Sequence, residues 1–140
     1  MAAWIDRGRR LDIELSVALE IGRHQMDRAE TARQRDEAIR YNSRLWAAIR
    51  HLAYGAPLVE DRDGLVAGAG QVLDSPEPHR IRHFNTLHAA RLARRAATGG
   101  ALRGLLGEWD SYRADRPRAE LGAWLLDRFE AQCQAPPMAA

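Results

Sequence analysis

Three histidines near the middle of the chain are the first candidates for chemistry. His79 and His83 lie four residues apart, so on a helix both side chains leave one face and could bind zinc together. A zinc site needs further ligands, and His88, five residues beyond His83, points away from the pair. No His-Glu-x-x-His pattern occurs either. We therefore interpret two of these histidines as solvated and the third as lying at the edge of a core, and we predict no metal and no other cofactor.

Arginine offers a second chemistry, the binding of phosphate groups or of an acidic partner. The basic segment spans residues 80–103 and contains Arg80, Arg82, Arg91, Arg94, Arg95 and Arg103. An ordinary solvated helix face would have the same composition, because basic residues are favourable near the C-terminus of a helix. Because the net charge of the chain is only +2, no strong overall field attracts nucleic acid. A small helical nucleic-acid-binding regulator is therefore the alternative interpretation rather than the preferred one.

Nucleophilic and acid–base catalysis find little support in the residue types. All 21 basic residues are arginine, which excludes a Walker A loop and a Schiff-base enzyme because both require lysine. Cys133 lies close to the end of the chain, a poor position for an activated thiol. Glu108 and Asp110 flank Trp109 and would point to different sides of a helix. We predict that the protein is not an enzyme.

Three closely spaced glycines allow two interpretations. Gly64, Gly68 and Gly70 could form a phosphate-binding loop, or they could allow close approach between helices. We favour the second interpretation, because no lysine and no preceding strand accompany the glycines.

The elements that would position these residues are all helices. In residues 8–30 apolar residues recur at spacings of three and four, and the same pattern returns in residues 38–53. Both apolar faces are wide, as in helices that contact more than one neighbour. The pattern lapses between Asp27 and Glu37, where we predict a turn that folds the second helix back against the first.

The second half of the chain continues the helical pattern. We predict helices over residues 61–73, 77–98 and 101–113, with Gly99-Gly100 ending the second of these. A last helix is predicted to open at Asp115-Arg116-Pro117. The fold class is thus all-α, a bundle of five to six helices in a single domain over residues 1–132, with a disordered tail at 133–140. The predicted core includes Leu15, Leu19, Leu45, Ile49, Leu52, Leu105, Trp124 and Leu125.

The centre of the second helix carries a family resemblance. The segment Asn42-Ser43-Arg44-Leu45-Trp46, followed by Leu52-Ala53, resembles the central helix of the FlaF family of bacterial flagellar biosynthesis regulators. The resemblance covers about residues 10–73. Beyond this range the sequence departs from the family. The family also has a Leu-Pro pair opening the next helix, and the nearest match here is Pro57-Leu58. It implies a protein that binds flagellin, supports its secretion and works beside the regulator FlbT.

The resemblance and the wide apolar faces together predict a protein that binds a helical partner. The expected partner is flagellin or another helical protein, held as a helix in a groove, with no membrane partner. The predicted partner-binding residues are Tyr41, Asn42, Arg44, Leu45, Trp46, Ile49 and Arg50. A single cysteine and the lack of an apolar run long enough for a signal peptide or a membrane span predict a cytoplasmic protein.

Overall fold

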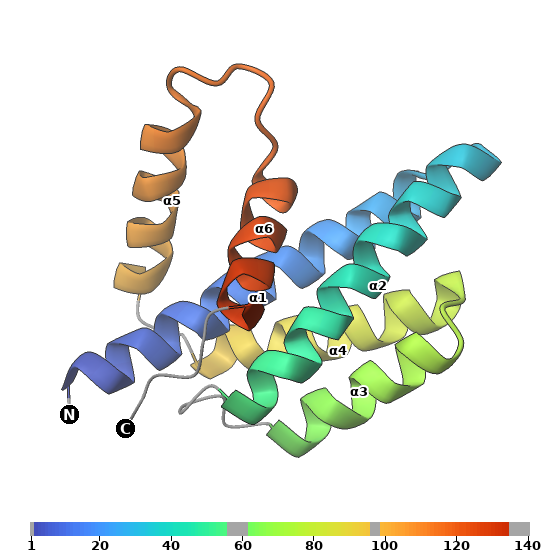
Figure 1. Ribbon diagram of the computed structural model, residues 1–140, viewed down its shortest axis with the longest axis horizontal. Helices are drawn as coiled ribbons and strands as arrows, with labels where there is room; N and C mark the ends of the chain where they lie inside the picture. Colours follow the sequence, from blue (N-terminus) through green and yellow to red (C-terminus); the bar gives the residue numbers. More distant parts are fainter. Residues whose placement is uncertain (1, 56–61, 96–98, 135–140) are drawn as a thin grey trace.

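The protein folds into six α-helices. The computed structural model describes the backbone of residues 2–55, 62–95 and 99–134, and side chains within these ranges for residues 10–55, 62–94 and 100–134. The helices are α1 (Ala2–Arg28), α2 (Ala32–Gly55), α3 (Arg62–Asp74), α4 (Pro78–Arg95), α5 (Gly99–Arg113) and α6 (Leu121–Gln134) (Figure 1). No strand occurs in the described ranges, which confirms the predicted all-α class.

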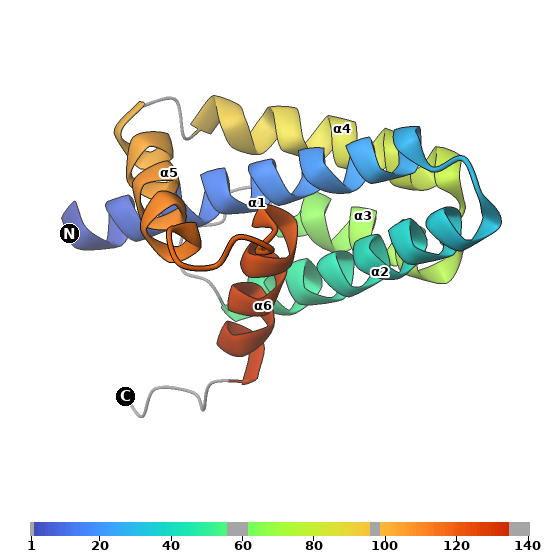
Figure 2. The same ribbon diagram turned by 90° about the horizontal axis from the view of Figure 1, so that it is seen from above.

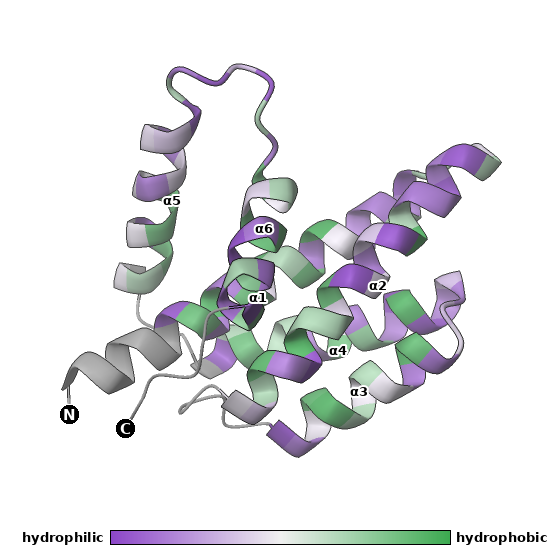
Figure 3. Ribbon diagram, in the orientation of Figure 1, coloured by the Kyte–Doolittle hydropathy of each residue, from purple (hydrophilic) through white to green (hydrophobic). Residues whose placement is uncertain are grey.

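The turn between the first two helices lies where the apolar pattern lapses. α1 ends at Arg28, and α2 begins at Ala32, earlier than the apolar pattern alone predicts. Thr31 and Gln34 form a capping box: the Gln34 amide donates to Thr31 Oγ1 at 3.1 Å, and the Thr31 amide donates to Gln34 Oε1 at 3.2 Å. These two bonds satisfy amides that the start of a helix leaves open, so α2 starts in a hydrophilic stretch (Figure 3).

Several predicted boundaries differ from the observed ones. α1 begins at Ala2, before the predicted start at residue 8. Gly99 and Gly100 begin α5 instead of ending the fourth helix, whose described part ends at Arg95. Residues 114–120 are not helical, so α6 begins only at Leu121. α6 also continues to Gln134, so Cys133 and Gln134 are helical instead of part of a disordered tail; the rest of that predicted tail, residues 135–140, lies outside the described residues.

Helices α1 to α4 pack as one bundle, and α5 and α6 pack against its outside. α1 lies along α4, α2 lies along α3, and α1 and α2 are joined face to face (Figures 1 and 2). α6 crosses over α2 and α1 (Figure 2). α5 packs on α1 and touches α6 through side chains, and it projects from the bundle (Figure 1).

The core lies where these helices meet. Of the eight predicted core residues, seven are buried: Leu15, Leu19, Leu45, Ile49, Leu52, Leu105 and Leu125. The eighth, Trp124, is only half-buried and packs against the core, because it also lines a hollow between α5 and α6 that is open to solvent.

Candidate partner-binding site

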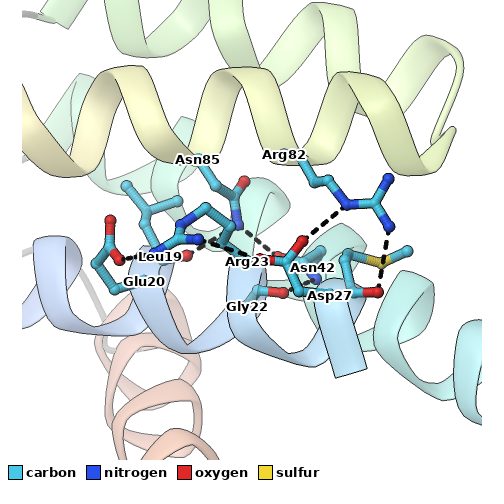
Figure 4. Close-up of polar contacts among 9 residues, drawn as sticks. Leu19, Glu20, Gly22, Arg23, Asp27, Asn42, Arg82 and Asn85 are labelled. Carbon is cyan, nitrogen blue, oxygen red and sulfur yellow. Dashed lines mark hydrogen bonds and ion pairs between the residues drawn. The ribbon is translucent and has the colours of Figure 1, made fainter. Parts of the chain in front are cut away.

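A buried network of amide side chains lies at the centre of the bundle. Asn85 of α4 donates from Nδ2 to Asn42 Oδ1 of α2 at 2.7 Å and to the Leu19 carbonyl of α1 at 3.0 Å. Asn42 donates in turn to the Gly22 carbonyl at 3.1 Å (Figure 4) and to the Ala38 carbonyl at 2.8 Å. Both asparagines are fully buried, so each bond forms away from water, where an unmade bond is costly.

Trp46 extends this network into the apolar core. Its Nε1 donates to Asn85 Oδ1 at 2.7 Å, and its ring meets the buried His88 ring edge-on at a centroid distance of 5.5 Å. Asn42 and Trp46, both from the segment that resembles the FlaF family, therefore join α1, α2 and α4.

Two glycines make these contacts sterically possible. A Cβ atom on Gly22 would overlap Asn42 Oδ1 and lie 2.9 Å from Asn85 Nδ2. A Cβ atom on Gly68 would lie 2.9 Å from His88 Nε2 and 3.2 Å from the Trp46 ring. Gly68 thus supports the interpretation of close helix approach, whereas nothing lies within 4 Å of such an atom on Gly70.

The structure divides the predicted partner-binding residues into two groups. Four of them, Asn42, Leu45, Trp46 and Ile49, are buried in the core. Tyr41 is half-buried, and Arg44 and Arg50 are exposed. Of the seven predicted residues, a partner could therefore touch only these last three in the intact protein. Their role in binding stays a prediction.

Helix α6 covers much of the same side of α2. The Tyr41 hydroxyl donates to the Gly122 carbonyl at 3.1 Å, and Arg44 Nε donates to Glu130 Oε2 at 3.1 Å. A second bond joins the Arg44 guanidinium to Glu130 Oε1, and Cys133 Sγ lies 3.7 Å from the Ala48 carbonyl. The contacts run along the length of α6, so an amphipathic helix already occupies this side of α2.

Burial and ion pairing shift the pKa values of three side chains at this contact. Burial raises the pKa of the Tyr41 phenol, which stays a neutral hydrogen-bond donor. The hydrogen bond to Glu130 raises the pKa of Arg44 further. Burial also raises the pKa of the Cys133 thiol, which lowers the fraction of reactive thiolate.

A charged cluster joins α1 to α5 and α6. Glu14, almost fully buried, pairs with Arg10 at 2.9 Å and with Arg128 at 3.1 Å, and the same two arginines also pair with Glu108. Burial raises the pKa of Glu14, and the charges of Arg128 and Arg10 only partly oppose that shift. Glu14 is not among the residues predicted from the sequence, where its one signal is a carboxylate inside an apolar stretch.

An aromatic groove lies between α5 and α6. Trp109, Tyr112 and Trp124 pack with ring centroids 5.4 to 5.9 Å apart, and Arg116 and Arg128 stack on the Tyr112 and Trp124 rings. The groove has a volume of about 580 Å³ and is open to solvent. Arg128, which lines the groove, and the nearby Arg116 each already occupy one face of a ring where a cationic ligand could stack.

The candidate metal ligands do not come together. His79 and His83 are exposed, and His88 is buried. Among the residues that the structure describes, no group of three or more His, Cys, Asp or Glu side chains could hold a metal ion. The absence of zinc stays a prediction.

The arginine segment is partly used inside the protein. Arg82 donates to Asp27 at 2.9 Å and to the Met26 carbonyl at 3.3 Å, which ties α4 to the end of α1 (Figure 4). Arg80 donates to Gln71 of α3. Arg91, Arg94 and Arg103 are exposed. The segment therefore does not form one uniform basic surface.

Comparisons with family models, curated proteins and solved structures give no match for this chain. None of the described helices combines the length and the apolar character that crossing a membrane requires.

Proposed function

We propose that the protein is a non-enzymatic flagellar regulator that binds flagellin as a secretion chaperone in the cytoplasm. The observation that carries the proposal is that α2 already holds one amphipathic helix, α6, along the side that bears Tyr41 and Arg44. A surface of this kind suits helix-in-groove recognition, the mode expected for an amphipathic end of flagellin. The identity of the partner rests on the resemblance of residues 42–46 to the FlaF family.

The exposed arginines of α2 give a test that spares the fold. Arg50 is exposed and lies about 180° around α2 from Tyr41, so it acts on a partner only by electrostatic steering. We therefore expect Arg50→Glu to weaken flagellin binding by roughly threefold, through a slower and more salt-dependent on-rate. Arg44→Glu is a less direct probe, because it also breaks the pair with Glu130 and loosens α6.

The measurement is a titration of soluble flagellin with wild type, Arg50→Glu and Arg94→Glu, with helicity followed by circular dichroism. Arg94→Glu is the matched control, because it makes the same change of net charge on α4. Folded wild-type protein that binds no flagellin at tens of micromolar would refute the proposal. Equal losses for both variants would show that only overall charge matters.

A further inference from the structure

Helix α6 has the pattern of a recognition helix. Its buried residues Gly122, Leu125, Leu126 and Phe129 follow spacings of three, four and seven, while Ala123 and Asp127 on its other side are exposed. This is the anchor pattern of a helix that lies with its apolar side in a groove.

The surface beneath α6 requires a small residue at one position of the helix that it binds and favours a carboxylate at another. A Cβ atom on Gly122 would lie 2.9 Å from Ile21 Cγ2 and 3.1 Å from the Tyr41 hydroxyl oxygen, so only a very small residue fits there. Two turns further along, Arg44 pairs through two nitrogens with the carboxylate of Glu130. These two features fix the register of whichever helix occupies the surface.

The segment that precedes α6 is an exposed turn, which would let α6 move relative to the other helices. Residues 114–118 are exposed, and the backbone bonds within the connection are those of turns, from Arg116 to Arg113 and from Ala119 to Arg116. α1 to α4 pack on one another without α6 (Figure 2). Departure of α6 would break its ring contacts with α5, between Trp124 and Trp109, and the pair of Arg128 with Glu14.

We infer that the surface of α1 and α2 beneath α6 is the docking surface for a partner helix, and that α6 is a resident occupant which the partner displaces. The partner is an amphipathic helix with glycine or alanine at one position, apolar residues three, four and seven positions later, and a carboxylate at the eighth to meet Arg44. This inference rests on the proposed partner-binding function and specifies its surface and its regulation.

The main test uses the full chain and a fluorescent peptide of residues 119–134 that carries Cys133→Ser. In the wild type the tethered α6 competes at an effective concentration in the millimolar range, so the peptide should bind only at about millimolar concentration. Phe129→Ala in the chain weakens the resident helix and should raise the apparent peptide affinity about a hundredfold. The matched control is the same peptide with Phe129→Ala, which should lose this gain.

A charge exchange keeps the inference testable if Phe129→Ala fails to fold. The chain carrying Glu130→Arg should bind the peptide with Glu130 about threefold more tightly than it binds a peptide with Glu130→Arg. Adding Arg44→Glu to that chain should reverse the preference. The inference would be overturned if the preference between the two peptides did not depend on the charge at residue 44. It would also be overturned if the folded variants bound no peptide at millimolar concentration.

A competition experiment between flagellin and the peptide distinguishes failure of this inference from failure of the proposed function. Flagellin binding that the peptide does not compete away leaves the function standing and overturns the docking surface. Peptide binding by a chain that ignores flagellin supports the surface and refutes flagellin as the partner. A dimer that forms by exchange of α6 between two copies would make a second copy the occupant, and would overturn the assignment to a foreign helix.

Discussion

Replacing Gly22 by alanine tests the buried amide network with a single methyl group. Alanine normally stabilises a helix interior by about 1 kcal/mol relative to glycine. At Gly22 the new methyl would overlap Asn42 Oδ1, so the Asn42 side chain must move. The move breaks its bonds with Asn85 and with the Gly22 carbonyl.

The magnitude follows from those two bonds. Each is worth about 1 kcal/mol, and the buried groups left without partners cost about 1–3 kcal/mol more. After the gain in helix propensity is subtracted, we expect Gly22→Ala to lower the free energy of unfolding by about 2–4 kcal/mol. At about 4 °C for each kcal/mol, the Tm should fall by about 8–16 °C.

The assay is urea and thermal unfolding followed by circular dichroism. Gly70→Ala on α3 is the matched control, because its methyl meets no atom within 4 Å; it should raise stability by about 0.5–1 kcal/mol. In a chain that carries Asn42→Ala, the Gly22 substitution should lose most of its cost. Equal stability of the Gly22→Ala and Gly70→Ala proteins would refute this account of the network.

Two further predictions concern titration and metal. Burial raises the pKa of Glu14 above its ordinary value of 4.5, so the folded protein holds this proton more tightly than the unfolded chain. The stability that this provides is present below pH 4.5 and is lost as the pH rises through the pKa of the folded state. Glu14→Gln should therefore match wild type near pH 4 and exceed it in stability at pH 7, as measured by urea unfolding at both pH values; a wild type that is the more stable at pH 7 would show that the pairs with Arg10 and Arg128 outweigh burial. The purified protein should contain no stoichiometric zinc and keep its helicity in a chelator, since His79 and His83 lack further ligands; one zinc per chain by elemental analysis would contradict this.

Periodicity predicted the helices well and their partners poorly. Leu45 and Ile49 recur at helical spacing, and that alone places them on the buried side of α2. Asn42 lies on the same side, but the sequence pattern places a polar residue beside an apolar stripe at the solvent-exposed edge of the helix. Its partners, the Gly22 carbonyl and Asn85, lie 20 and 43 residues away, and only the packed bundle brings them together.

The position of α6 shows the same limit for the candidate site. The sequence indicates an apolar side on α6 and a wide apolar side on α2, but nothing in either pattern says that they meet. The pairing of Arg44 with Glu130 crosses 86 residues, and neither residue type distinguishes an internal pair from a solvated charge. Without that contact, Arg44 is predicted to face a partner protein.

The segment that resembles the FlaF family is mainly an architectural element in this structure. Asn42, Leu45 and Trp46 are buried, and each contributes to the core or to the network that joins α1, α2 and α4. Residues of this kind specify how helices pack. Their resemblance to a family therefore bears more directly on helix packing than on what the protein binds. Arg44, the middle residue of the motif, is the exception, because its side chain is exposed and pairs with Glu130 of α6. If the partner helix displaces α6, the same guanidinium that closes the surface also binds the carboxylate of the incoming helix. Arg44→Glu should then loosen α6 and weaken the partner together, so its net effect on affinity should be smaller than that of Glu130→Arg, which weakens only the resident helix.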